Sequence, residues 1–103
     1  MKKPTSESLE IAKYIHTFIA DYAPTHKTNS GNTLKSYRNA LTLYLTFLEK
    51  EMHITPSNLC MDCFSLEYIE KWMRWIHESR GCSAQTCNIR LGALRTFLKY
   101  LSD

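Results

Sequence analysis

The sequence predicts an all-α domain, and three observations lead to this prediction. Apolar residues recur at three- and four-residue steps in four separate segments, which is the spacing of one face of an α-helix. The chain has only three glycines and three prolines among 103 residues, few for a β-rich domain with many tight turns. Polar residues that favour turns separate the segments. We therefore expect a small bundle of four helices around a single core.

The first helix is expected to begin at Thr5 or Ser6 and to end at about Tyr22. Pro24 should stop it, because proline disfavours the helical conformation in the residue before it. Residues 24–32 should then form a polar loop. The expected core face consists of Leu9, Ala12, Ile15, Ile19 and Tyr22, widened by Tyr14 and Phe18.

The second helix is expected to start near Thr33, with Asn32 as its N-cap, and to run to about Met52. Its far side is small, polar or basic, since residues 33–50 contain three bases and a single acid, Glu49. The apolar stripe is formed by Leu34, Tyr37, Leu41, Tyr44, Leu45 and Leu48. The polar face is formed by Lys35, Asn39, Thr42, Thr46 and Lys50, flanked by Ser36 and Arg38.

A connection at residues 53–64 leads to a third helix, expected at about Leu66–Arg80 with Ser65 as its N-cap. Leu59 and Phe64 should fill the core from the connection. Gly81 should end the helix, because glycine readily adopts the left-handed conformation found after many helices. The inward side is formed by Ile69, Trp72, Met73 and Ile76, and the wet side by Glu67, Glu70, Lys71, Arg74 and Glu78.

The last helix, Ser83–Leu101, contains no carboxylate. Ser83 is its expected N-cap. A solvated helix usually mixes both signs of charge, so a long helix without acids indicates a negatively charged partner. The apolar stripe is formed by Cys87, Leu91, Leu94, Leu98 and Leu101, with Phe97 at its edge. The opposite side carries Gln85, Asn88, Gly92, Arg95, Thr96 and Lys99.

The composition is that of one small domain, with 44% hydrophobic and 12% aromatic residues. We expect residues 1–103 to form this domain, with a flexible tail at residues 1–4. No run of about 18 apolar residues occurs, so no membrane partner is expected. No apolar segment typical of a signal peptide follows the N-terminal lysines, which makes the cytoplasm the expected location. The net charge is +3, and the bases concentrate on the second and fourth helices, as a phosphate-binding surface requires.

The four cysteines are a possible zinc site. Cys60 and Cys63 form a CxxC motif, to which Cys82 and Cys87 could add two ligands. The spacing of the second pair is unusual for structural zinc, so we favour a core position for Cys87 and loop positions for the others, with no metal and no other cofactor. No catalytic residue is assigned, because the histidines fall in separate segments without a nucleophile at a suitable spacing: His16, His26, His53 and His77.

Two stretches resemble the core-binding domain of tyrosine recombinases, the family of the phage integrases. Residues 32–41, followed by Phe47 and Leu48, are similar to the opening pattern N-T-L-x-x-Y-x-x-x-L…F-L of that domain. Residues 83–101 are similar to its closing pattern S-x-x-T-x-N-x-x-L-x-x-L-R-x-F-x-x-Y-L. The resemblance covers about residues 6–103 and implies a four-helix, SAM-like orthogonal bundle. It also implies that the second and fourth helices lie against the major grooves of DNA.

In that family a separate catalytic domain supplies the nucleophilic tyrosine and clamps the duplex from the opposite side. The resemblance therefore implies a non-catalytic fragment, or a stand-alone homologue, of an integrase that acts in DNA integration and recombination. None of the six tyrosines of this chain is expected to be the nucleophile. The implied partners are double-stranded DNA, the catalytic domain of the same full-length chain and other recombinase protomers on DNA.

The chemistry of each residue type indicates its expected role on DNA. Arg90 lies partly off the polar face, so it could pair with an acid on another helix and not with DNA. A helical protein-interaction module and a small zinc or thiol enzyme are the alternative functions. Phosphate contacts are expected from Lys35, Arg38, Arg90, Arg95 and Lys99. Contacts to base edges are expected from Asn39, Gln85 and Asn88. Contacts to phosphate oxygens near helix starts are expected from Thr33, Ser36 and Thr86.

Overall fold

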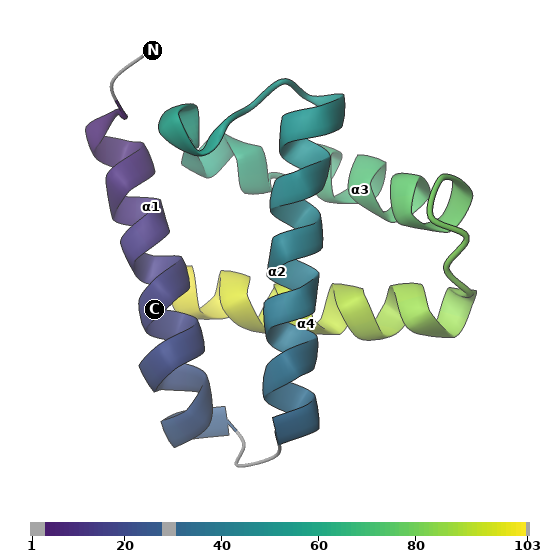
Figure 1. Ribbon diagram of the computed structural model, residues 1–103, viewed down its shortest axis with the longest axis horizontal. Coiled ribbons are helices and arrows are strands. Elements are labelled where there is room, and N and C mark those ends of the chain that lie inside the picture. The colour runs from purple at the N-terminus through teal and green to yellow at the C-terminus, as the bar shows by residue number, and fades with distance from the viewer. Residues whose placement is uncertain (1–3, 28–30, 103) are drawn as a thin grey trace.

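The computed structural model of the protein describes residues 4–27 and 31–102, and within these ranges it contains four α-helices and no strand. Figure 1 shows α1 running downward and α2 running upward beside it, with α3 and α4 running horizontally across them. The predicted all-α bundle is confirmed, and its helices cross as in an orthogonal bundle. Their bounds are Ser6–Thr17 for α1, Gly31–Glu51 for α2, Leu66–Glu78 for α3 and Ala84–Ser102 for α4.

The first helix does not stop before Pro24, so that prediction is wrong. After α1 the chain continues in the wider turns of a π-helix, η1 (Phe18–Lys27), which contains Pro24. Phe18 and Ala23 are both 0% exposed, and this burial outweighs the unfavourable effect of proline on the local backbone. The described part of the expected loop is therefore helical up to Lys27, and residues 28–30 lie outside the described residues.

The core face of α1 also differs from the prediction. Ile11 is 1% exposed and lies at the centre of the face, whereas Leu9 is 59% exposed and Tyr14 is 40% exposed. Ile11 and Phe18 are seven residues apart, which places them on the same side of the helix two turns apart. Apolar side chains occur on both sides of α1, so their spacing alone does not identify the buried side, and packing against the other helices decides it.

Helix α2 starts at Gly31, so Asn32 lies inside the helix and is not its N-cap. The predicted core residues Leu41, Tyr44 and Leu48 are buried. The buried stripe is wider than predicted, because Ala40, Leu43 and Phe47 are buried as well.

Local signals placed the ends of the other two helices correctly. Ser65 caps α3 by accepting a hydrogen bond from the Tyr68 amide, and Ser83 caps α4 by accepting one from the Thr86 amide. Gly81 adopts a φ of 66° after α3, the left-handed conformation expected there. The preceding connection forms two 3₁₀ turns, η2 (Pro56–Asn58) and η3 (Met61–Phe64).

A chain of aromatic rings fills the core between the helices. Neighbouring ring centroids lie 5.3 to 6.0 Å apart, within the range of favourable aromatic pairs. Phe97, predicted at the edge of the apolar stripe of α4, is 0% exposed and lies within the core. The hydroxyl of Tyr44 donates to the backbone carbonyl of Cys63 and so joins α2 to η3. The rings follow the order Phe18, Phe97, Phe64, Tyr44 and Trp72.

Candidate nucleic-acid interface

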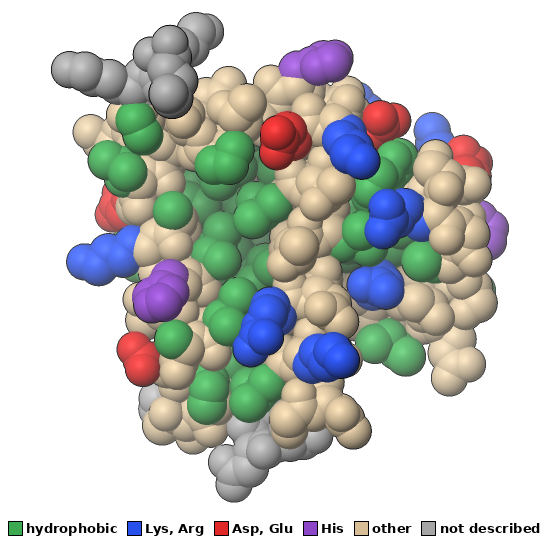
Figure 2. Space-filling model, viewed as in Figure 1, with side chains coloured by type: hydrophobic (Ala, Val, Ile, Leu, Met, Phe, Trp, Pro, Cys, Tyr) green, Lys and Arg blue, Asp and Glu red, His purple; other side chains and the backbone are tan. Residues whose placement is uncertain are grey.

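The outer face of α2 is polar and basic. Lys35, Arg38, Asn39 and Thr42 are exposed, and no acid occurs on the helix before Glu49. Figure 2 shows basic side chains gathered over α2 and between α2 and the end of α3, whereas the acidic ones in this view lie near the upper end of α2 and toward the edges. This face therefore offers an anion a positive potential that nearby carboxylates do not cancel.

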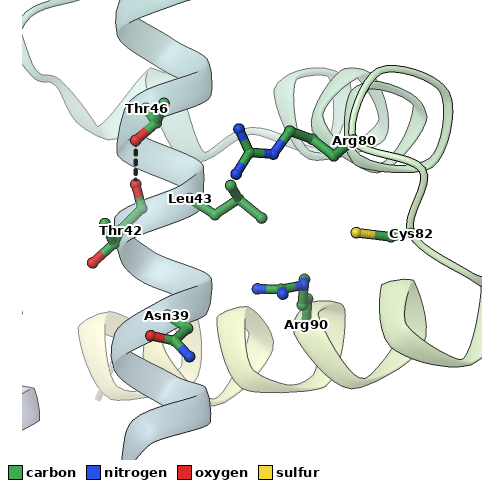
Figure 3. Close-up of a pocket in the computed structure, with 7 residues that line it drawn as sticks. All are labelled: Asn39, Thr42, Leu43, Thr46, Arg80, Cys82 and Arg90. Atoms are coloured by element: carbon green, nitrogen blue, oxygen red, sulfur yellow. Dashed lines mark hydrogen bonds between the residues drawn. The ribbon is translucent and has the colours of Figure 1, made fainter.

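A hollow of about 410 Å³ lies where α2, α4 and the turn after α3 meet. Figure 3 shows Arg80 and Arg90 reaching toward α2 from two different parts of the chain. The wall contributed by α2 carries an amide and two hydroxyls, and no carboxylate of the described residues lines the hollow. The lining residues are Asn39, Thr42, Leu43, Thr46, Arg80, Cys82 and Arg90.

One nitrogen of the Arg90 guanidinium is buried without a partner among the described residues. Its Nε atom is buried and has no hydrogen-bond partner, and Arg90 makes no ion pair with the part of the chain that the structure describes. The alternative that Arg90 pairs with an acid on another helix is therefore not seen. A buried donor without a partner is costly, by about 1–3 kcal/mol, and because Nε is shielded from solvent, a ligand in the hollow would meet the terminal nitrogens of the guanidinium instead.

Arg80 belongs to this site although the sequence pattern did not single it out. Its guanidinium carbon lies 5.6 Å from the centroid of the Trp75 ring, a cation–π contact that orients the side chain. Trp75 itself packs against Phe47, with ring centroids 5.6 Å apart, so the ring that contacts Arg80 is held in place by α2. The position of Arg80 directly before the turn glycine Gly81 was the available sequence signal.

A second hollow, of about 180 Å³, adjoins the same two helices. It is lined by Ser36, Asn39, Thr86, Ile89 and Arg90, so Asn39 and Arg90 line both hollows. The structure thus brings together four of the residues predicted to contact DNA: Ser36, Asn39, Thr86 and Arg90.

The remaining predicted residues of α4 do not share this surface. Successive residues of an α-helix are turned by about 100°, so Asn88, Arg95 and Lys99 lie about 130–170° around α4 from the flank that lines the hollows. All three are exposed there. Gln85, also exposed, lies about 90° from that flank by the same geometry. The two acid-free faces therefore do not form one continuous surface.

On α2, Lys35 and Arg38 lie on the exposed face with Asn39, while Thr33 does not. Thr33 is half-buried and lies about 160° around the helix from Lys35, on the side that faces the core. The predicted contact of Thr33 with phosphate is therefore less accessible than those of Lys35 and Arg38.

The other candidate sites from the sequence give no metal centre among the described residues. No group of three or more histidine, cysteine or acidic side chains is arranged there to hold a metal ion. Cys87 is buried as expected, and burial raises the pKa of its thiol. Cys63 is buried too, whereas Cys60 and Cys82 are partly exposed. No helix among the described residues has the length and apolarity that crossing a membrane requires.

Comparison with known proteins identifies the family to which the chain belongs. The family of phage integrase N-terminal SAM-like domains matches residues 17–103. Two relatives from Sinorhizobium fredii (strain NBRC 101917 / NGR234) are each 24% identical to the chain: "Putative integrase/recombinase y4rC", over 87% of this chain, and "Putative integrase/recombinase y4rD", over 94%. The chain covers 27% and 34% of the length of these relatives. No solved structure matches the chain significantly.

Proposed function

Because the chain belongs to the family of phage integrase N-terminal SAM-like domains, we propose that it is the DNA-binding module of a site-specific tyrosine recombinase. The observation that supports this most is the acid-free hollow between α2 and α4, into which Arg80 and the incompletely satisfied Arg90 project. An anion that accepts hydrogen bonds from both guanidinium groups fits this site, and DNA presents such groups along its backbone.

The proposed surface is narrower than the sequence suggested. Lys35 and Arg38 from α2, with Arg80 and Arg90 at the hollow, would contact phosphates and supply most of the affinity. Asn39 would lie toward the base edges, where an amide can form two hydrogen bonds with adenine. The hydroxyls of Ser36, Thr42 and Thr86 would complete contacts to the backbone. The outer face of α4, with Asn88, Arg95 and Lys99, would lie away from this contact.

Strand cleavage is proposed to belong to another part of the protein. The chain spans about a third or less of the length of the curated relatives it matches, and their names describe them as integrases or recombinases. A catalytic domain of the same full-length chain would clamp the duplex from the opposite side, and further protomers would assemble on the same DNA. The domain would thus take part in DNA integration and recombination by holding the duplex in place.

Titration of a fluorescently labelled duplex into ¹⁵N-labelled protein tests the proposal. Binding is expected to be weak for an isolated module, on the order of 10⁻⁴–10⁻⁶ M, and to weaken steeply with added salt. Amide shifts should cluster on α2, on the N-terminal half of α4 and around Arg80. The absence of shifts at low ionic strength would contradict DNA binding and favour a protein-interaction module. Shifts confined to Arg95 and Lys99 would contradict the proposed surface while leaving DNA binding intact.

A further inference from the structure

Cys60 directly precedes the 3₁₀ turn η3 and Cys63 lies within it, and the two side chains lie close together. Their Sγ atoms are 3.2 Å apart, and the Cys63 amide donates to the Cys60 carbonyl over 3.0 Å, which closes the turn between them. A disulfide has an S–S distance of about 2.05 Å, so the two sulfurs would need to approach by only about 1 Å, which small side-chain rotations can supply. Both cysteines are free.

The two thiols differ in accessibility. Cys60 is partly exposed, whereas Cys63 is 1% exposed. Burial raises the pKa of the Cys63 thiol to about 11, so this thiol stays protonated at neutral pH. A reagent from solution therefore meets Cys60 first, while Cys63 is held beside it within the fold.

We propose that Cys60 and Cys63 form a dithiol site that low-molecular-weight disulfides, such as oxidised glutathione, convert reversibly to an intramolecular disulfide. The Cys60 thiolate attacks one sulfur of the reagent, forms a mixed disulfide and releases one glutathione thiolate, which takes up a proton. The Cys63 thiol then loses its proton to solvent, and its sulfur attacks the Cys60 Sγ. The second glutathione leaves as a thiolate and is protonated. One reagent disulfide is thereby reduced to two thiols, and the two cysteine thiols are oxidised.

The surroundings of η3 hold this pair in position. The Cys63 carbonyl accepts the hydroxyl hydrogen bond of Tyr44 from α2, and the Met61 amide donates to the Glu7 carboxylate of α1 over 2.8 Å. The turn is therefore anchored on both sides, which favours closure of the disulfide over a persistent adduct at Cys60. The closed loop is very short, so the disulfide should change the overall stability little through chain entropy.

The sequence offers a direct way to test the proposal. Trypsin cleaves after lysine and arginine, so it separates residues 51–71, with Cys60 and Cys63, from residues 81–90, with Cys82 and Cys87. The folded chain is equilibrated with defined mixtures of oxidised and reduced glutathione. Free thiols are then blocked with N-ethylmaleimide, the chain is digested with trypsin without reduction, and the peptide masses are measured by mass spectrometry. The Cys82→Ser/Cys87→Ser variant serves as the control for exchange between the two pairs.

Peptide 51–71 is expected to form its disulfide, with the loss of two hydrogen atoms, at a low ratio of oxidised to reduced glutathione. Oxidation of peptide 81–90 should require a ratio at least about tenfold higher. The Cys63→Ser variant should instead accumulate a glutathione adduct on Cys60, because the second sulfur is missing. Oxidation of both peptides at the same ratio would overturn the proposal. So would a stable adduct on Cys60 in the unmodified chain, or an unchanged thiol pair. Circular dichroism of each variant confirms that it is folded.

Discussion

Asn39 of α2 and Arg90 of α4 line the same two hollows, one of about 410 Å³ and one of about 180 Å³. They are 51 positions apart in the chain, and the packing of α2 against α4 brings them to one surface. The amide supplies both a donor and an acceptor, and the guanidinium supplies donors with a fixed charge. A ligand at this crossing therefore meets hydrogen-bonding groups from both helices at once.

Arg90→Met should separate DNA binding from stability. The methionine keeps an apolar stem of similar length but removes the charge and the buried Nε that has no partner. Affinity for duplex DNA is expected to fall by about tenfold or more, since a hydrogen bond to a charged group is worth about 1.5–3 kcal/mol. The slope of log affinity against log salt concentration should become shallower by about 1, as expected for the loss of one phosphate contact. The free energy of unfolding should stay the same or increase.

Arg74→Met is the matched control for this substitution. Arg74 is an exposed arginine on the wet side of α3, outside both hollows. Its substitution should leave the affinity within about threefold, as expected for a charge acting only through the screened field of the protein. Equal losses in the two variants, measured by fluorescence anisotropy, would show that net charge and not the hollow determines binding.

Two charge reversals test which faces of the helices meet the duplex. Lys35→Glu/Arg38→Glu changes two positions on the outer face of α2, and Arg95→Glu/Lys99→Glu changes two on the outer face of α4. Both change the net charge by the same amount. The first pair should abolish measurable binding, because like charges would face the phosphates, whereas the second should weaken it only several-fold through the long-range field. A stronger loss in the α4 pair would place the DNA on the opposite side of that helix.

The sequence predicted the fold better than it predicted the site, and the reason is physical. The caps at Ser65 and Ser83 and the left-handed Gly81 depend on a few neighbouring residues, so a local pattern identifies them. The stripe of α4 was predicted only in part, since Cys87 and Leu94 are buried as expected but Phe97, expected at the edge of the stripe, is fully buried. The π-helical turns around Pro24 were missed, since the burial that maintains them is tertiary.

The composition of the candidate surface depends on how α2 and α4 cross, which periodicity along one helix does not reveal. Arg95 and Thr86 both lie away from the centre of the apolar stripe, yet only Thr86 faces α2. Arg80 was missed because it lies beyond the end of α3 at Glu78, where helical spacing no longer indicates a direction. Its contact with Trp75 becomes visible only when the turn after α3 is placed in space.

Tyr44→Phe should destabilise the domain by about 1–2 kcal/mol. The hydroxyl of Tyr44 donates to the Cys63 carbonyl in the core, and its removal leaves that buried acceptor without this partner. The aromatic contacts of the ring with Phe64 and Trp72 are retained in phenylalanine. Urea unfolding followed by circular dichroism measures the change. Tyr68→Phe is the control, because Tyr68 is a half-buried tyrosine at the start of α3. It should change the free energy of unfolding by less than half as much as Tyr44→Phe does. An equal change in the two variants would show that the hydrogen bond of Tyr44 contributes little.

Stability should fall as the pH rises above about 9, because buried neutral groups resist losing their protons. Burial raises the pKa of Cys63 from 9.0 to about 11 and raises that of Tyr44 above its ordinary value of 10.0. Between these ordinary and raised values the unfolded chain has released protons that the folded chain still holds. The unfolded state then binds fewer protons, so the free energy of unfolding decreases with pH, by at most about 1.4 kcal/mol per pH unit for each group. The contribution is fully present below about pH 9 and is lost progressively above it.

Urea unfolding at a series of alkaline pH values measures this decrease, and Cys63→Ala isolates one part of it. The variant lacks the thiol, so its stability should decline less between the ordinary and raised pKa values of Cys63 than that of the unmodified chain. The loss of stability that comes from Tyr44 begins about one pH unit higher, because the ordinary pKa of tyrosine is 10.0, and it should remain in the variant. Cys87, whose pKa burial also raises, contributes in the same direction in both proteins. Parallel declines in the two proteins would show that the Cys63 thiol ionises as freely in the folded state as in the unfolded chain.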